Sequence, residues 1–206
     1  VEVDIYEDLE QDCNWSGYLG IDIGSTSTKA VLATPGGAVI SGFYTRTAGR
    51  PLLAIQAIFR AMSDIERKHG RTFNVRACGT TGSGRKFIGA IIGADTVVDE
   101  ITAHAQAALE LNPDVDTIIE IGGQDAKFTT LSDGRVTAST MNNVCAAGTG
   151  SFIEEQAAKL GCRISEYSER TEGIAAPMVS DRCTVFMERD INHLLSEGYN
   201  VDEVLA

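Results

Sequence analysis

The chain has 206 residues, 43% hydrophobic and 22% charged, with 21 Gly and 4 Pro; this composition excludes a disordered, collagen-like or low-complexity chain and predicts a globular protein. Its formal net charge of −12 makes the phosphate backbone of nucleic acid an unfavourable partner. The sequence shows no signal peptide and no apolar run near the ~20 residues of a membrane helix. The five cysteines are an odd number, and together these observations lead us to expect a cytoplasmic protein with reduced thiols.

The first part of the chain predicts an α/β lobe. Residues 1–16 are acidic and without a period, which is typical of a tag, a linker or a domain boundary. Apolar runs and turn residues then predict strands over 18–23, 28–33, 38–47, 73–79 and 96–98, and helices over 51–70, 85–92 and 100–111. Asp99 is the expected N-cap of the last helix. Asn112-Pro113 ends that helix and marks a lobe boundary, which gives a first lobe over 17–112.

The second part repeats this order of elements. Strands are expected over 117–121, 125–131 and 135–140, and the last two form a hairpin about the Asp133-Gly134 turn. Helices are expected over 150–160 and 184–195. Two copies of strand, glycine turn, hairpin and helix thus lie about 100 residues apart, which predicts a second lobe over 113–206 and a ligand cleft between the lobes.

Each predicted lobe carries a glycine loop after its first strand. The loops read DIGSTSTK over residues 22–29 and EIGGQDAK over residues 120–127. Small residues leave backbone amides free to surround phosphate oxygens, and a carboxylate at a strand end can hold hydrated Mg²⁺. The spacing matches neither a Walker loop nor the dinucleotide fingerprint.

Two cysteines precede predicted helices. Cys145 stands just before the helix that begins near Gly150, and Cys183 opens the run that begins at Thr184. A helix N-terminus favours thiolate, and an iron–sulfur cluster is usually held by four cysteines. From the residues alone, both ordinary buried thiols and cluster ligands stay open. Cys78 and Cys162 are expected to be structural.

The two loops resemble the phosphate-1 and phosphate-2 motifs of the actin, sugar-kinase and Hsp70 ATPase superfamily. Together with the segments 80–85, 100–105, 143–150 and 181–186, they resemble most closely the BadF/BadG/BcrA/BcrD group of 2-hydroxyacyl-CoA dehydratase activators and benzoyl-CoA reductase ATPase subunits. The resemblance implies an α/β, actin-like (ribonuclease H-like) fold of two lobes. It also implies a fragment of a large activase with the second lobe incomplete, because the adenosine-binding turn has no match after Gly150; we therefore expect weak ATP binding.

The resemblance further implies a set of site residues. ATP would be bound by the residues Gly24, Ser25, Thr26, Ser27, Lys29, Gly122, Gly123, Gln124 and Lys127. The catalytic residues would be Asp22, which holds Mg²⁺ through water, with Gln124, Asp125 and Glu100. His104, one turn after Glu100, and Arg85 are secondary candidates. Cys145 and Cys183 would hold one 4Fe–4S cluster shared across a homodimer or between tandem units.

The function that this implies is ATP hydrolysis coupled to one-electron transfer from the cluster to a low-potential iron–sulfur dehydratase or reductase of anaerobic metabolism. A small-molecule kinase of the sugar type is one alternative, and it would need no iron. A non-catalytic interaction module is another. Iron content separates the first from the second, and ATP turnover separates both from the third.

Overall fold

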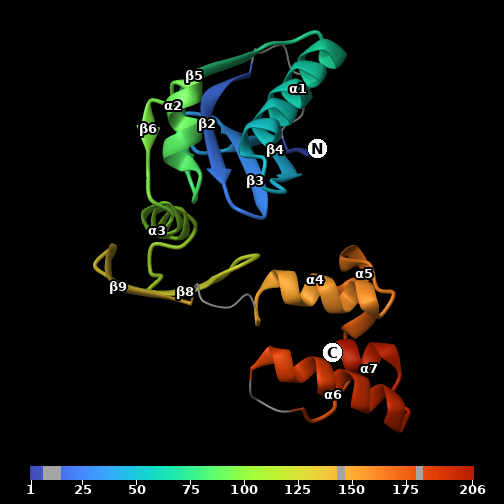
Figure 1. The fold of residues 1–206 in the computed structure, drawn as a ribbon. Helices are drawn as coiled ribbons and strands as arrows, with labels where there is room; N and C mark the ends of the chain where they lie inside the picture. Colours follow the sequence, from blue (N-terminus) through green and yellow to red (C-terminus); the bar gives the residue numbers. More distant parts are fainter. Residues whose placement is uncertain (7–14, 143–146, 180–182) are drawn as a thin grey trace. The chain divides into compact units, whose positions relative to one another are not determined.

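The computed structural model describes residues 1–6, 15–142, 147–179 and 183–206 (Figure 1). The chain divides into two compact units. Unit 1 comprises Val1–Ile118 and Thr129–Ala138, and unit 2 comprises Ile119–Phe128 and Ser139–Ala206. Within the described ranges, no helix is both long enough and apolar enough to cross a membrane.

Unit 1 is built on a six-stranded sheet. In chain order its strands are β1 (Glu2–Ile5), β2 (Trp15–Ile23), β3 (Ser27–Ala33), β4 (Val39–Arg46), β5 (Phe73–Thr81) and β6 (Thr96–Val97). They lie in the order β1-β4-β3-β2-β5-β6. The pairs β2–β3, β3–β4 and β1–β4 are antiparallel, whereas β5 pairs parallel with β2, and β6 parallel with β5. Short turns join β2 to β3 and β3 to β4, and helices precede the two parallel strands, as chain geometry requires.

Three helices accompany this sheet: α1 (Pro51–His69), α2 (Arg85–Ile92) and α3 (Glu100–Leu111) (Figure 1). Alternate residues of β2, among them Leu19 and Ile21, are buried in one core cluster with Ile55 and Ile58 of α1. Because successive strand residues point to opposite faces, Gly20 and Asp22 lie on the other face of the sheet. The α1 side of the sheet therefore supplies stability, and the opposite side is left for other contacts.

Residues 1–16 differ from the expected linker. The structure places strand β1 at Glu2–Ile5, antiparallel to β4, although all four of its residues are exposed. It also begins β2 at Trp15, whose side chain is only 6% exposed and whose ring lies 4.7 Å from that of Phe73. Acidic residues are poor strand formers, so the composition of this segment does not predict a strand. The strand forms because its backbone pairs with β4, which is distant in the sequence.

Three further strands form a separate sheet in the order β7-β8-β9: β7 (Thr117–Ile121), β8 (Ala126–Ser132) and β9 (Arg135–Asn142). Asp133 and Gly134, with φ of 51° and 69°, make the hairpin turn, which confirms that prediction. The helices of unit 2 are α4 (Gly150–Lys159), α5 (Ile164–Thr171), α6 (Thr184–Glu197) and α7 (Val201–Leu205). Cys162 is buried there in a small apolar cluster with Leu205. Helix α5 is not predicted from the sequence, because an acidic stretch with no buried residue gives no apolar period.

Asp99 is the N-cap of α3, as predicted. The substitution Asp99→Ala removes this cap and is expected to lower the free energy of unfolding by about 1 kcal/mol. Its carboxylate accepts the Thr102 hydroxyl at 2.6 Å and the Thr102 N–H at 3.0 Å, and these hydrogen bonds lower the pKa of Asp99. A folded-state pKa below the unfolded one gives stability that is present above the unfolded pKa and is lost as pH falls through the folded pKa.

Urea denaturation at neutral and acid pH measures this effect. Asp99→Asn is the matched control, because the amide oxygen still caps the helix but does not titrate. It should keep most of the stability and lose the acid dependence that belongs to Asp99. An Asn variant as unstable as the Ala variant would contradict the cap.

Candidate functional site

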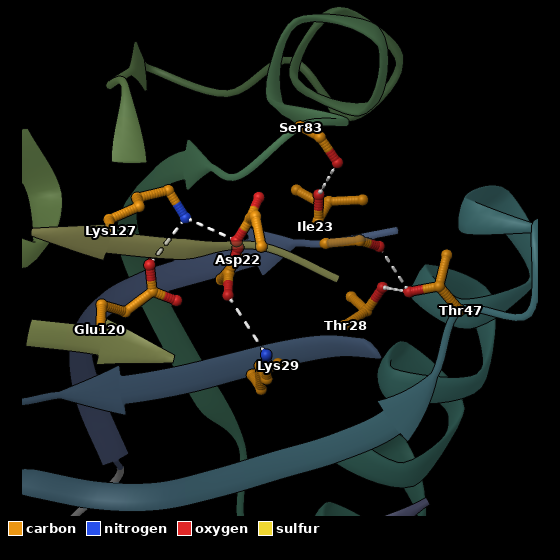
Figure 2. A network of polar contacts seen from close by, with 10 residues as sticks. Asp22, Ile23, Thr28, Lys29, Thr47, Ser83, Glu120 and Lys127 are labelled. Atoms are coloured by element: carbon orange, nitrogen blue, oxygen red, sulfur yellow. Dashed lines mark hydrogen bonds and ion pairs between the residues drawn. The ribbon is translucent and has the colours of Figure 1, made fainter. Parts of the chain in front are cut away.

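The first glycine loop is a tight turn between β2 and β3. The Gly24 N–H donates to the Ser27 carbonyl at 3.0 Å, and a Cβ at Gly24 would lie 2.8 Å from that oxygen, so a larger residue does not fit. Thr47 fixes the turn from β4's end, because its hydroxyl donates to the Gly24 carbonyl at 2.7 Å and its N–H to the Thr26 carbonyl at 2.8 Å. The hydroxyl of Thr28 lies 2.8 Å from that of Thr47 (Figure 2). The turn is thus held in one conformation.

Asp22 and Lys29 face each other across β2 and β3 at the base of this turn (Figure 2). Lys29 Nζ is 3.5 Å from Asp22 Oδ2, and the side chains are 45% and 34% exposed. A third loop packs on the carboxylate: a Cβ at Gly82 would lie 2.3 Å from Asp22 Oδ1, and the φ of Gly82 is +82°. The carboxylate is therefore fixed in place, while the loose ion pair leaves both charges accessible.

The second glycine loop has the same turn. The Gly122 N–H donates to the Asp125 carbonyl at 2.8 Å. In both loops, therefore, the glycine N–H donates to the carbonyl of the residue three positions later. Here the start of α4 holds the loop: the Thr149 hydroxyl donates to the Gly123 carbonyl at 3.0 Å, and the Gly150 N–H to the Gly122 carbonyl at 2.9 Å. The two loops that repeat in the sequence therefore also share the hydrogen bond that closes the turn.

The two lysines of the repeat differ in their surroundings. Lys127 is only 4% exposed, and its Nζ lies 2.7 Å from Glu120 Oε2 (Figure 2). The same Nζ lies 2.9 Å from Asp125 Oδ1. One cation thus neutralises two carboxylates, which are 26% and 32% exposed. Lys127 orders the second loop, whereas Lys29 has a weak partner that an anion can replace. Equal spacing in the sequence gives no signal of this difference.

A cavity of about 830 Å³ lies in unit 1 beside the first loop. Cross-strand neighbours form two rows in its lining, one of Lys29, Asp22 and Thr81, the other of Val31, Gly20 and Gly79. Helix α3 contributes the residues Thr102, Ala103, His104, Gln106, Ala107 and Glu110. Glu100, which the sequence favoured as catalytic, is not among the lining residues, so α3 brings its secondary candidate His104 to the cavity of Asp22 instead.

Gly20 leaves space in this cavity, and Gly20→Ala is therefore expected to raise the free energy of unfolding by up to about 1 kcal/mol. A Cβ at Gly20 would have no atom within 4 Å, and its φ is not positive, so neither packing nor backbone requires glycine there. Urea denaturation measures the change. Gly24→Ala is the control, because its Cβ would clash with the Ser27 carbonyl and should destabilise. A destabilised Gly20→Ala variant would show that the space is not open.

The other predicted residues are placed as follows. Arg85 Nη1 donates to the Gly82 carbonyl at 3.0 Å, so its side chain stabilises the third loop. Gln124 is exposed on the second loop. Cys183 is exposed at the N-cap of α6, a helix N-terminus as predicted. Cys145 lies outside the described residues. Across the described ranges no group of three or more His, Cys, Asp and Glu side chains is arranged to hold a metal ion.

Three residues that shape the loops were not predicted to do so. Thr47 lies outside every motif and Thr149 lies in the segment 143–150, and each holds a loop through its hydroxyl. Gly82 supports Asp22, and the only pointer to it is the Gly-Ser-Gly sequence of its own loop.

Comparison with known proteins identifies the family. The family model described as BadF/BadG/BcrA/BcrD ATPase family matches residues 19–206. The chain belongs to the BadF/BadG/BcrA/BcrD ATPase family. This confirms the resemblance that the glycine loops and the cysteine segments predicted.

Several members of this ATPase family are similar over most of the chain. The (R)-2-hydroxyglutaryl-CoA dehydratase activating ATPase of Acidaminococcus fermentans is 33% identical over 196 residues, which cover 91% of this chain and 71% of that protein. The activator of lactoyl-CoA dehydratase of Anaerotignum propionicum is 35% identical over 193 residues, with coverages of 91% and 71%. The solved structure of the activator of the 2-hydroxyisocaproyl-CoA dehydratase from Clostridium difficile with bound ADPNP has a TM-score of 0.75 at 28% identity, and covers 91% of this chain and 69% of that one. The likeness confirms the predicted α/β, actin-like fold.

Proposed function

We propose that this BadF/BadG/BcrA/BcrD family member is an ATP-dependent activator that couples ATP hydrolysis to one-electron transfer to a low-potential iron–sulfur dehydratase or reductase. The observation that carries the proposal is the accessible Asp22–Lys29 pair at the base of a rigid, glycine-tight turn. Relatives of the chain also support the proposal, because several are named as activators of acyl-CoA dehydratases and one solved structure of a relative contains ADPNP.

In this proposal the first loop binds the phosphates of ATP. The Gly24 N–H is already bonded to the Ser27 carbonyl, so the amides proposed to face the anion are those of Ser25 and Thr26 rather than the predicted Gly24 amide. Lys29 exchanges its 3.5 Å contact with Asp22 for a phosphate oxygen. Asp22 suits hydrated Mg²⁺, because a fixed and partly exposed carboxylate can accept hydrogen bonds from the waters that this ion keeps. The magnesium ion would supply charge neutralisation at the phosphates.

The second loop is proposed to act at the terminal phosphate. The exposed Gln124 and the adjacent Asp125 would orient the attacking water. Gly123 would present its amide, whereas the Gly122 N–H is already bonded to the Asp125 carbonyl. Phosphoryl transfer needs mainly positioning and charge stabilisation, so an ordered loop is the main requirement. Lys127 meets that requirement by neutralising Glu120 and Asp125. His104 is proposed as a further group at the Asp22 cavity, in preference to Glu100.

The cluster ligands are proposed from the chemistry of the two thiols. Cys183 is exposed at the N-terminus of the 14-residue helix α6, where a thiolate or an anionic cluster is stabilised. Cys145 would supply the second thiolate, and two such pairs, from two copies or from tandem units, would complete the four ligands of a 4Fe–4S cluster. That group would supply the transferred electron.

A physical connection between loop and cluster ligand supports the coupling. Gly150 and Thr149, at the start of α4, donate hydrogen bonds to the Gly122 and Gly123 carbonyls. Cys145 stands four residues before Thr149 in the sequence. A change in the second loop between the ATP and ADP states would therefore be transmitted to the start of α4 and along the chain toward this thiol. It would shift the population of conformations that surround the cluster.

Calorimetric titration with Mg-ATP and Mg-ADPNP tests the nucleotide part of the proposal. The wild-type chain is expected to bind, and Lys29→Met is expected to weaken binding about tenfold or more, since a charged hydrogen bond is lost. Lys68→Met, an exposed lysine of α1, is the matched control and should bind as the wild type does. Absence of binding in the wild type, or equal affinity in both variants, would overturn it.

A further inference from the structure

An open apolar groove of about 560 Å³ lies on the other side of the unit 1 sheet from Asp22. It is lined mainly by the residues Phe59, Met62, Phe73, Val75, Ile91 and Ile92. Val75 is 37% exposed and Ile91 is 50% exposed, so the groove presents apolar side chains to solvent. Large apolar side chains gathered at one exposed hollow mark an interaction site more often than isolated ones do.

The groove lies in the basic part of an acidic chain. Residues 50–92 hold eight Lys and Arg against two Asp and Glu, a net charge of +6; the remainder holds nine against 27, a net charge of −18. A second hollow on α1 shares Phe59 and Ser63 with the groove and carries Arg60 and Arg67. Positive charge therefore adjoins the apolar lining.

Three carboxylates lie at or near the groove, one of which, Glu66, is a lining residue, and each has a partner within the chain. Asp64 pairs with Arg67 at 2.8 Å, Glu66 accepts a backbone N–H at 2.7 Å, and Asp95 accepts another at 2.7 Å. Among the described residues, no carboxylate partner is found for three cations of α1 and α2: Arg60, Lys68 and Lys86. Of these, Arg60 lies in the hollow that adjoins the groove, so the apolar floor has a cation beside it that an acidic partner can pair with.

We propose that this groove docks an acidic amphipathic helix of a partner protein. The apolar stripe of such a helix would lie on Ile91, Val75 and Phe59, and its Asp and Glu residues would pair with the unengaged cations. A second copy in a two-fold arrangement would bring two faces of like charge together, which is unfavourable. The groove shares no lining residue with the Asp22 cavity.

A fluorescent helical peptide of about 18 residues tests the proposal, with Leu at i, i+3, i+4 and i+7 and Glu on the other face. A matched peptide has Lys in place of every Glu. In anisotropy titrations the Glu peptide is expected to bind and to weaken several-fold when salt is raised from about 0.05 to 0.3 M, and the Lys peptide is not expected to bind.

Two variants locate the contact. Ile91→Asp is expected to weaken binding of the Glu peptide at least about tenfold, since an apolar contact becomes a repelling charge. Leu53→Asp is the control, because Leu53 is 53% exposed on α1 but does not line the groove. Circular dichroism and urea denaturation show that both variants fold.

Three outcomes would overturn the proposal: equal binding of both peptides, no binding of the Glu peptide, or equal weakening by the two variants. Sedimentation of the chain alone provides one more: association that Ile91→Asp abolishes would make this face a contact between copies. None of these measurements uses nucleotide, so the ATPase proposal stands or falls separately.

Discussion

Lys127→Met is expected to lower the free energy of unfolding by about 3 kcal/mol, at the lower end for a broken buried ion pair because both carboxylates keep some solvent contact. It is also expected to abolish ATP hydrolysis. The substitution leaves Glu120 and Asp125 without the cation that lies 2.7 and 2.9 Å from them. The second loop then carries two unneutralised carboxylates beside the place proposed for the terminal phosphate. Urea denaturation and phosphate-release assays measure the two effects.

Lys159→Met is the matched control. Lys159 also pairs with two carboxylates, Glu155 at 2.9 Å and Glu188 at 2.7 Å, but it is 46% exposed. Ion pairs at such a surface contribute little, so this variant should be close to the wild type in stability and activity. Equal stability of the two variants would contradict the role given to Lys127.

Asp22→Asn is expected to slow ATP hydrolysis about 100-fold or more, with little change in stability. Asn has the shape of Asp and fits beneath Gly82, and the ion pair that it would lose is the loose one to Lys29 at 3.5 Å. What is lost is the negative charge that would hold hydrated Mg²⁺. Phosphate release is measured over a range of Mg²⁺ concentrations.

The control for that loss is Asp64→Asn. Asp64 is 68% exposed on α1 and pairs with Arg67 at 2.8 Å, away from the cavity residues. It should hydrolyse ATP at the wild-type rate. If Asp22→Asn kept the wild-type rate and Mg²⁺ dependence as well, Asp22 would have no role in hydrolysis.

Local signals made much of the fold predictable. The Asp133-Gly134 turn and the Asp99 cap act over a few residues, and each lies where the sequence placed it. Strand β1 and the burial of Trp15 were not predictable in this way, because they depend on pairing and packing with β4 and Phe73, which are distant in the sequence.

The motifs of the site were predictable from the sequence, but the burial and the contacts of their side chains were not. The sequence places an acidic residue, glycines and a lysine in both loops, yet only tertiary packing makes Lys29 accessible and Lys127 buried. The role of Thr47 and Thr149, which hold the two loops, was not predictable because it depends on where β4 ends and where α4 begins. The roles of the individual site residues, and the pairing of Cys145 with Cys183, stay predictions.

Iron content after anaerobic reconstitution with iron and sulfide tests the central claim most directly. It is measured per chain, with the electron paramagnetic resonance spectrum of the reduced sample, for the wild type, Cys183→Ser and the control Cys78→Ser. A cluster shared by two chains predicts about two irons per chain in the wild type and in Cys78→Ser, and loss of iron and spectrum in Cys183→Ser. A wild type without bound iron, or a Cys183→Ser variant that keeps it, would contradict an activator that delivers electrons from this cluster.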